Sequence, residues 1–371
     1  MNGLTFGNPC HKNPANLLLF DFPLARAAGR FENIGLGIAI GIGIEREYES
    51  IAIPRPIATP RGIDSHKGTL MSGSLLALLS SICFAACNIC TRRGVMRIKD
   101  AALGGYISVF VAPPLFLLVA MALDDLRAIA AFSKEGYLWL GVAGIIHFVL
   151  GRSSNFWSFK YLGANMASVF SALQLVYTIF LGFFLLGEQI TGNMILGSLL
   201  IMVGPALLAW PQGDSHTARG DQDDGKPRLS RPGVMAALLA GVFFGISPFF
   251  IKRGLAEGGS ALAGAFISYS SASFILGLSM INTVRRTEII RMETKALLWF
   301  VASGLFVALA QLLRYSALKS DPISVVGPLI ATTPVFLLAF SFIMNRKVES
   351  FRMNVILGAL LVVLGAALVY R

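Results

Sequence analysis

Charge is scarce in this sequence. Only 14% of its 371 residues are Asp, Glu, Lys or Arg, whereas 55% are hydrophobic; a soluble domain carries about 25% charge. This composition excludes an ordinary soluble protein and indicates that most of the chain lies in lipid. The net charge of +11 does not point to nucleic acid, because the basic residues lie in short loops between apolar runs and form neither a zinc-finger spacing nor a basic helix face.

Cysteines and catalytic motifs are few as well. Cys10 lies in the N-terminal tail, and Cys83, Cys87 and Cys90 share one apolar run, so no disulfide framework is expected. Those three thiols fall on one helical face and could hold a soft metal, but no His or Met cluster completes such a site, and apolar packing is the expectation. The sequence has no Walker loop, nucleophile elbow or HExxH motif. We therefore expect no enzyme activity, cofactor or metal.

Residues 1–70 differ from everything that follows. They carry Pro, Arg and Gly without helical periodicity, and the alternating run at 34–44 is too short to span a membrane. Glu45 follows that run and no small-residue cleavage site does, which argues against a secretory signal. We expect this segment to be an unstructured or spurious tail, with Met71 the better start.

From Met71 onward, apolar runs recur at regular intervals. Most are near the ~20 residues that a helix needs to cross the hydrocarbon core, and period-2 patterning of a barrel is absent. The sequence therefore predicts an all-α integral membrane protein with ten transmembrane helices. The expected spans are 74–91, 102–123, 137–159, 164–187, 193–210, 233–251, 260–283, 296–318, 323–345 and 353–370.

A polar linker at 211–232 divides two copies of one unit, 71–210 and 233–371. Residues 77–108 align with 237–268 without a gap and share Phe, Arg and Gly at fixed spacing; 187–208 align with 348–369 in the same way. Each copy holds five expected helices, an odd number, so the second copy must cross the membrane in the opposite sense. Such inverted repeats are typical of secondary transporters, with the binding site between the halves.

These features resemble the EamA-type transporters of the drug/metabolite transporter superfamily. The resemblance covers about 71–370 and rests on the repeat, on the basic-basic-Gly turns that end in Gly94 and Gly254, and on Leu-Gly-Glu at 186–188 followed by N-x-I-L-G. The second copy departs from the pattern, reading MNRKVE at 344–349. The resemblance implies transport without enzymatic activity and leaves the substrate open.

Two arginines lie inside apolar spans, Arg152 in the third and Arg314 in the eighth. Charge there costs about 2.5–3.5 kcal/mol on insertion scales, which marks a candidate functional site. Asn155 shares a helical face with Arg152, and Gln311 and Tyr315 accompany Arg314. Either Arg152 faces a water-filled cavity and pairs with a substrate anion such as a carboxylate, or it snorkels or pairs with backbone carbonyls. Snorkelling is easier for Arg314, nearer the end of its span.

The fourth span and its counterpart, the ninth, carry polar residues in mid-membrane. Pro334 removes a backbone donor and can kink the ninth helix, which predicts a broken-helix binding site; ordinary interhelical hydrogen bonding is the alternative. The first and sixth spans carry Asn88 and Ser247, the latter beside Pro248. The candidate binding residues in spans four and nine are Gln174, Tyr177, Thr178, Thr332, Thr333 and Pro334.

Three further residues could couple transport to protons. Glu188 and Glu349 lie at helix ends, where a structural role beside the dipoles of helices five and ten is the alternative. His147 precedes Arg152 by five residues and titrates in a suitable range, but a lone His in a helix also serves structural roles.

The sequence thus predicts a multi-pass transporter of the plasma membrane that moves a small polar or amphipathic metabolite, such as an amino acid, by alternating access. Export is the expected direction, driven by protons or by the substrate's own gradient. The alternatives are a passive channel or facilitator, and a membrane-embedded structural or sensor protein. Orientation stays open, because loop charges place both termini outside and the resemblance places them inside. The oligomeric state stays open too, and the sequence is compatible with a monomer.

Overall fold

A computed structural model describes residues 72–98, 101–208, 230–280, 289, 291–344 and 353–370. Within these ranges every regular element is helical and no strand occurs. The N-terminal segment before Ser72, most of the expected linker and Glu349 lie outside the described residues. The expectations about them stay predictions.

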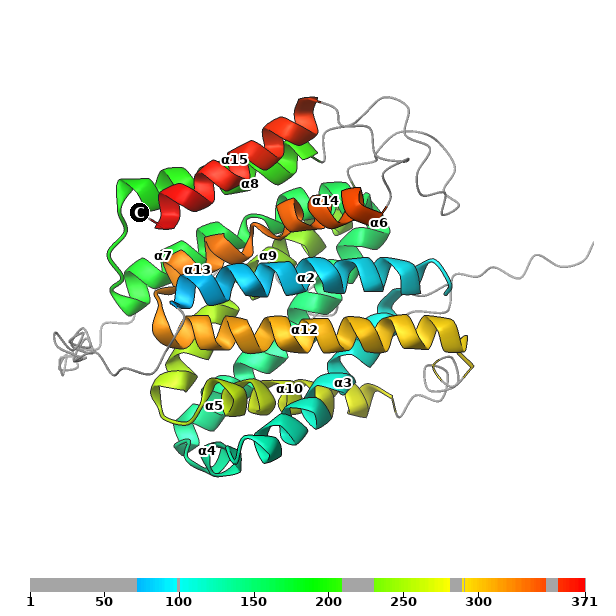
Figure 1. The fold of residues 1–371 in the computed structure, drawn as a ribbon, viewed down its shortest axis with the longest axis vertical. Helices are drawn as coiled ribbons and strands as arrows, with labels where there is room; N and C mark the ends of the chain where they lie inside the picture. The colour runs from blue at the N-terminus through cyan, green and yellow to red at the C-terminus, as the bar shows by residue number, and fades with distance from the viewer. Residues whose placement is uncertain are drawn as a thin grey trace, which may run out of the picture. The chain divides into compact units, whose positions relative to one another are not determined.

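The described residues of the first repeat form eight helical segments, shown from blue to green in Figure 1. They are α2 (Gly73–Val95), α3 (Ala101–Ala122), α4 (Leu126–Ala130), α5 (Lys134–Gly144), the π-helix η3 (Ile145–Gly151), α6 (Arg152–Ser171), α7 (Gln174–Leu186) and α8 (Gly192–Leu208). Ser72 caps α2 and Ser133 caps α5, each accepting a hydrogen bond from a backbone N–H of the first turn.

The second repeat begins with a longer helix and ends at the C-terminus. Its described segments are α9 (Arg231–Ala256), α10 (Ala261–Ser279), α12 (Thr294–Ser320), α13 (Ile323–Ile330), α14 (Thr333–Met344) and α15 (Met353–Tyr370). Pro232 lies in the first turn of α9, where its missing N–H costs no helical hydrogen bond.

Six described segments are long and apolar enough to cross a membrane: α2, most of α3, α9, α10, α12 and residues 323–340. Shorter apolar helices cover 174–186, 192–204 and 357–370. Large apolar side chains such as Phe180, Phe184 and Phe274 are more than half exposed. Outward apolar side chains on long helices are what a lipid-facing surface requires, so this is a multi-pass membrane protein.

The third and fourth expected spans are built differently from the prediction. The helical segment α6 continues through the expected boundary at 160–163. A straight helix of its length would separate its ends by about 30 Å. Yet Gly151 lies against Phe244 of α9, and Gln174 lies against the adjacent Gly245. The chain therefore reverses direction within α6, and both expected spans run along α9.

The fourth and ninth expected spans are both interrupted. Two residues separate α6 from α7, and Ala331 and Thr332 separate α13 from α14. At the second break, Pro334 cannot donate to the carbonyl of Ile330, and the Thr333 hydroxyl donates to it instead at 2.7 Å. The prediction of a break at Pro334 agrees with the structure. The break before Gln174 has no proline and follows from no local sequence signal.

Small residues set the closest helix contacts. Gly197 of α8 and Gly365 of α15 face each other so closely that a Cβ on either would lie 2.5 Å from the other's carbonyl oxygen. Gly204 meets Gly358 in the same way, with 2.7 Å to its carbonyl oxygen. The paired glycines therefore let α8 and α15 pack backbone to backbone.

Candidate functional site

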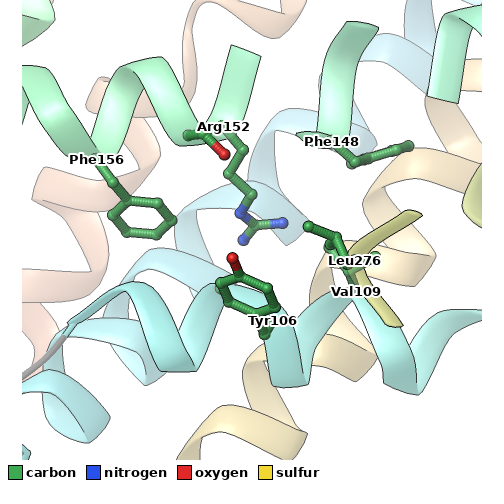
Figure 2. A pocket seen from close by; sticks show the side chains of 8 residues that line it. Tyr106, Val109, Phe148, Arg152, Phe156 and Leu276 are labelled. Atoms are coloured by element: carbon green, nitrogen blue, oxygen red, sulfur yellow. The ribbon is translucent and has the colours of Figure 1, made fainter. Parts of the chain in front are cut away.

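Arg152 lies beside a small cavity of about 20 Å³. The guanidinium extends from the start of α6 toward Tyr106 of α3 (Figure 2). The lining residues are Gly105, Tyr106, Val109, Phe148, Arg152, Ser153, Phe156 and Leu276. The cavity thus offers one cationic group among aromatic and aliphatic walls. Asn155, predicted to share this face, is half-buried one turn further along α6 and is absent from the lining.

The π-helix η3 ends immediately before Arg152. π-helical turns are rare and occur often at functional sites, because one extra residue per turn re-aims the side chains. Glycines at both ends permit close packing here. A Cβ on Gly144 would lie 2.0 Å from the carbonyl oxygen of Ser268, and one on Gly151 would lie 2.8 Å from the ring of Phe244. The segment that carries His147 is therefore held tightly between α9 and α10.

His147 joins the two repeats through polar contacts. Its Nε2 lies 3.2 Å from Nε2 of Gln311 and 3.3 Å from a terminal nitrogen of Arg314. Arg314 can only donate, so a ring nitrogen that faces it must be unprotonated and accept. The Arg314 side chain is only 7% exposed. It therefore lies within the protein, and the snorkelling alternative does not describe it.

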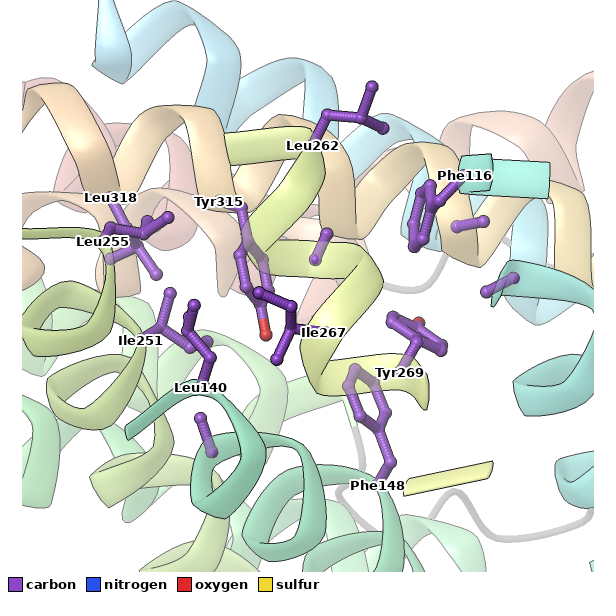
Figure 3. Packing of buried hydrophobic residues seen from close by; sticks show 14 of the residues in the cluster. Phe116, Leu140, Phe148, Ile251, Leu255, Leu262, Ile267, Tyr269, Tyr315 and Leu318 are labelled. Carbon is purple, nitrogen blue, oxygen red and sulfur yellow. The ribbon is translucent and has the colours of Figure 1, made fainter. Parts of the chain in front are cut away.

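Two tyrosines complete the buried polar cluster around His147 and Arg314. Tyr269 of α10 is fully buried, and its ring lies 4.0 Å from that of Phe148 and 5.5 Å from that of Phe116, centroid to centroid (Figure 3). Tyr315 is also fully buried in this packing. The hydroxyl of Tyr269 and Oε1 of Gln311 have no hydrogen-bond partner in the described structure.

Sequence reasoning missed Tyr269 and Phe148. Tyr269 stands in a run of small residues, ISYSSAS, and its single large polar side chain among serines was a usable signal. Phe148 offered none, since a Phe in an apolar helix is ordinary. Its position between the Arg152 cavity and the ring of Tyr269 depends on packing.

The described part of the protein has few ion pairs, and neither intramembrane arginine takes part in one. Arg97 pairs with Glu293 at 3.2 Å on the exposed surface, and Lys252 lies 3.9 Å from Glu188. Neither Arg152 nor Arg314 has an acidic partner among these residues. The positive charge of the candidate site is therefore not neutralised by described side chains.

The residues at the helix breaks form a separate polar region. Thr178 donates to the carbonyl of Gly245 at 3.0 Å, and Thr332 donates to the carbonyl of Leu329 at 2.7 Å, with its hydroxyl oxygen 3.2 Å from that of Ser81. Gln174, Tyr177, Thr333 and Pro334 are half-buried. None of these break residues lines the Arg152 cavity.

Asn88 and Ser247 are not brought to the cavity either. Asn88 is exposed on α2. Ser247 is fully buried in α9, and its hydroxyl has no described hydrogen-bond partner. The structure thus joins His147, Gln311 and Arg314, buries Tyr315 in the apolar core, and leaves Asn88 and Ser247 apart from the cavity.

Glu188 caps a helix of the other repeat. Its carboxylate accepts hydrogen bonds from the backbone N–H groups of Ile323 at 2.8 Å and Ser324 at 3.0 Å, at the start of α13. Lys252 donates to the carbonyl of Asp321 at 2.6 Å beside it. Glu188 therefore lies at the start of the ninth expected span, whereas the sequence analysis placed it beside the fifth. A role in proton coupling remains a prediction, for Glu188 as for His147.

The cysteines of α2 lie in packed surroundings. Cys87 and Cys90 are buried, and the sulfur of Cys87 lies 3.2 Å from the hydroxyl of Ser303. No group of three metal-ligating side chains occurs among the residues that the structure describes.

Long apolar helices around two arginines, one buried and one half-buried and neither with an acidic partner among the described residues, define a multi-pass helical membrane protein with a polar interior. The EamA-like transporter family matches residues 71–210 and 231–371, and the chain belongs to that family of membrane transporters. Its fold is also similar to that of a protein of known crystal structure, with a TM-score of 0.63 and 16% identity over 80% of this chain and 94% of the other. A comparison with curated proteins finds no match.

Proposed function

We propose that this protein is a secondary transporter that exports a small polar or amphipathic metabolite, such as an amino acid, across the plasma membrane by alternating access. The observation that carries the proposal is the cavity at Arg152, where one cationic side chain meets aromatic walls. Ligand sites are typically apolar cavities with a few polar groups that orient the ligand. In this proposal Arg152 binds an anionic group of the substrate.

The proposed architecture is ten transmembrane helices in two inverted five-helix repeats. Contacts exchanged between the repeats support it. The first helix of one repeat, α2, packs against α12, α13 and α14 of the other, and its counterpart α9 packs against α5, α6 and α7. The counterparts α8 and α15 pack against each other, as do α3 and α10. Exchanged contacts of this kind are expected from two halves related by a pseudo-two-fold axis.

The proposed partners are the substrate, the bilayer and protons, with no nucleic acid, no cofactor and a monomer as the working unit. Alternating access needs a site that each half can uncover in turn. The two helix breaks, one in each repeat, are suitable hinges, because broken helices supply both flexibility and free backbone groups.

A transport assay on the purified protein tests this function. Cells with and without the protein are first compared by metabolomics to find the substrate. That substrate is then followed in proteoliposomes for saturable uptake and counterflow. Counterflow supports a carrier, whereas flux without saturation or counterflow would assign a passive channel. No flux at all, together with an unchanged metabolite profile, would favour a structural or sensor protein.

The mutation Arg152→Ala tests the site. We expect it to abolish measurable substrate binding while the protein stays folded, and the exposed Arg97→Ala to leave binding unchanged. Full substrate binding by Arg152→Ala would remove Arg152 from the site.

A further inference from the structure

The expected membrane spans of this protein hold positive charge and no negative charge to balance it. Across all ten expected spans, the charged residues are Arg152 and Arg314, and no Asp or Glu is present. Both described ion pairs of the protein involve other residues. Because uncompensated charge is costly in a membrane interior, an anion bound from outside the chain would stabilise the two arginines.

The surroundings of Arg314 lack a counter-charge and contain unsatisfied polar atoms. Its described polar partner is His147, whose accepting ring nitrogen carries no charge. Oε1 of Gln311 is buried there without a partner, and the hydroxyl of Tyr269, whose ring packs on Phe148, is also buried without one. Buried polar atoms are almost always hydrogen-bonded, and exceptions need an explanation such as an absent ligand. If the Gln311 amide were flipped, its nitrogen would be left without a partner instead.

The two arginines are linked through η3. His147 of η3 contacts Arg314, and η3 runs directly into Arg152 at the start of α6. Phe148 of the same segment packs on Tyr269 and also lines the Arg152 cavity. A carboxylate in that cavity would meet the Arg152 guanidinium, whereas no acidic side chain is present in the expected spans to bind an ammonium group.

We propose that the substrate carries net negative charge: it is an organic carboxylate on an apolar or aromatic frame, without an ammonium group. Arg152 and Arg314 attract the carboxylate, and Tyr269 and Gln311 supply hydrogen-bonding groups that set specificity. This inference rests on the proposed transport function and narrows it, since a zwitterionic amino acid of the same frame would be the weaker ligand.

Matched probes that differ only in charge test the proposal. One set is pyruvate, alanine and ethylamine; the other is phenylpyruvate, phenylalanine and phenethylamine. Binding to the full chain in detergent and flux in proteoliposomes are measured at pH 7. In at least one set we expect the keto acid to bind about tenfold or more tightly than the amino acid, and the amine not to bind, because only the keto acid has net charge of the required sign.

Variants of the two arginines test whether these residues cause the preference for the keto acid over the amino acid. We expect Arg152→Gln and Arg314→Gln each to reduce the preference at least about threefold, and Arg314→Lys, which keeps the charge, to retain most of it. Arg97→Gln, which removes an exposed arginine, is the matched control and should change nothing. If Arg314→Gln does not fold, Arg152→Gln and Tyr269→Phe carry the test, and Tyr269→Phe should weaken keto-acid binding.

Each outcome separates the two proposals. Equal or tighter binding of the amino acid, with flux, overturns the anion inference and leaves transport standing. Selective keto-acid binding without flux sustains the inference and contradicts transport. If no probe binds and none is transported, both proposals are contradicted. Chloride that occupies the site as tightly as the keto acids and competes with them would assign it to an inorganic ion and overturn the substrate assignment.

Discussion

At the scale of single residues, the buried polar atoms without partners are the most informative feature. Tyr269, Gln311 and Ser247 each place such an atom inside the protein. Leaving a buried donor or acceptor unpaired costs about 1–3 kcal/mol, so such groups persist where another requirement keeps them. Tyr269 packs on Phe148, which lines the Arg152 cavity, and substrate binding is the requirement we infer for it.

Tyr269→Phe should have opposite effects on the stability of the protein and on its affinity for the substrate. Without substrate, the variant should be as stable as the parent protein or more stable, by up to about 1 kcal/mol, because an unpaired hydroxyl is removed and the ring contacts with Phe148 and Phe116 remain. Substrate affinity should fall. Thermal unfolding in detergent and equilibrium binding measure the two effects. A loss of stability without any loss of affinity would show that the hydroxyl is structural.

At the scale of elements, Glu188 ties the loop before α8 to the start of α13. Helix N-termini present free N–H groups and a partial positive charge, and a carboxylate satisfies both. Glu188 accepts from two of those groups, and its side chain is only 8% exposed. The contact joins the two repeats, because Glu188 belongs to the first and α13 to the second.

We therefore expect Glu188→Ala to destabilise the protein by about 2–4 kcal/mol, since two hydrogen bonds to a charged acceptor are lost in a mostly buried place. Amide hydrogen exchange at Ile323 and Ser324 should become faster in this variant, and the increase there should exceed any increase in α12. The control is Glu293→Ala, which removes an exposed ion pair and should change stability by less than about 1 kcal/mol. Unchanged exchange at α13 in Glu188→Ala would contradict the capping role.

The break between α13 and α14 gives a second prediction at this scale. Pro334→Ala restores the N–H that can bond to the carbonyl of Ile330, which the Thr333 hydroxyl now satisfies. We expect a more continuous helix, slower exchange of local amides and a lower transport rate, because the proposed hinge is stiffened. The control is Pro232→Ala, in the first turn of α9, where no helical hydrogen bond is gained. A normal transport rate with a continuous helix would remove the break from the mechanism.

At the scale of the whole molecule, the packing of α8 on α15 joins the last helices of the two repeats. In lipid, helices associate through close packing rather than through exclusion from water, so the contact depends on residues small enough to let backbones approach. Gly197, Gly204, Gly358 and Gly365 provide that approach.

Gly197→Ala should therefore destabilise the protein by at least about 2 kcal/mol, because its methyl group would lie 2.5 Å from the backbone oxygen of Gly365, which cannot move without shifting α15. Gly277→Ala is the matched control. A Cβ there has no atom within 4 Å, and replacing this glycine in the last turn of α10 should be neutral or stabilise by up to about 1 kcal/mol. Thermal unfolding in detergent compares them, and equal stabilities would show that α8 and α15 separate at little cost.

The sequence by itself determined the membrane class, most of the helices, the family and the two intramembrane arginines. These depend on composition, on the length of apolar runs and on repeated residues, all of which are local or periodic. The break at Pro334 could also be predicted from the local sequence, because proline has no backbone N–H to donate. The paired glycines of α8 and α15 recur about two helical turns apart in each copy, a spacing that puts both glycines on one helical face.

Only the tertiary structure decided how distant residues meet. The contact of His147 with Arg314 joins positions 167 residues apart, and the cap that Glu188 places on α13 joins positions 135 and 136 apart. The reversal within α6, the break before Gln174 and the place of Tyr269 depend likewise on the helices that pack around them. The type of a side chain and its place in a helical pattern indicate what it can bind. Which residue it contacts depends on how helices from both repeats pack together.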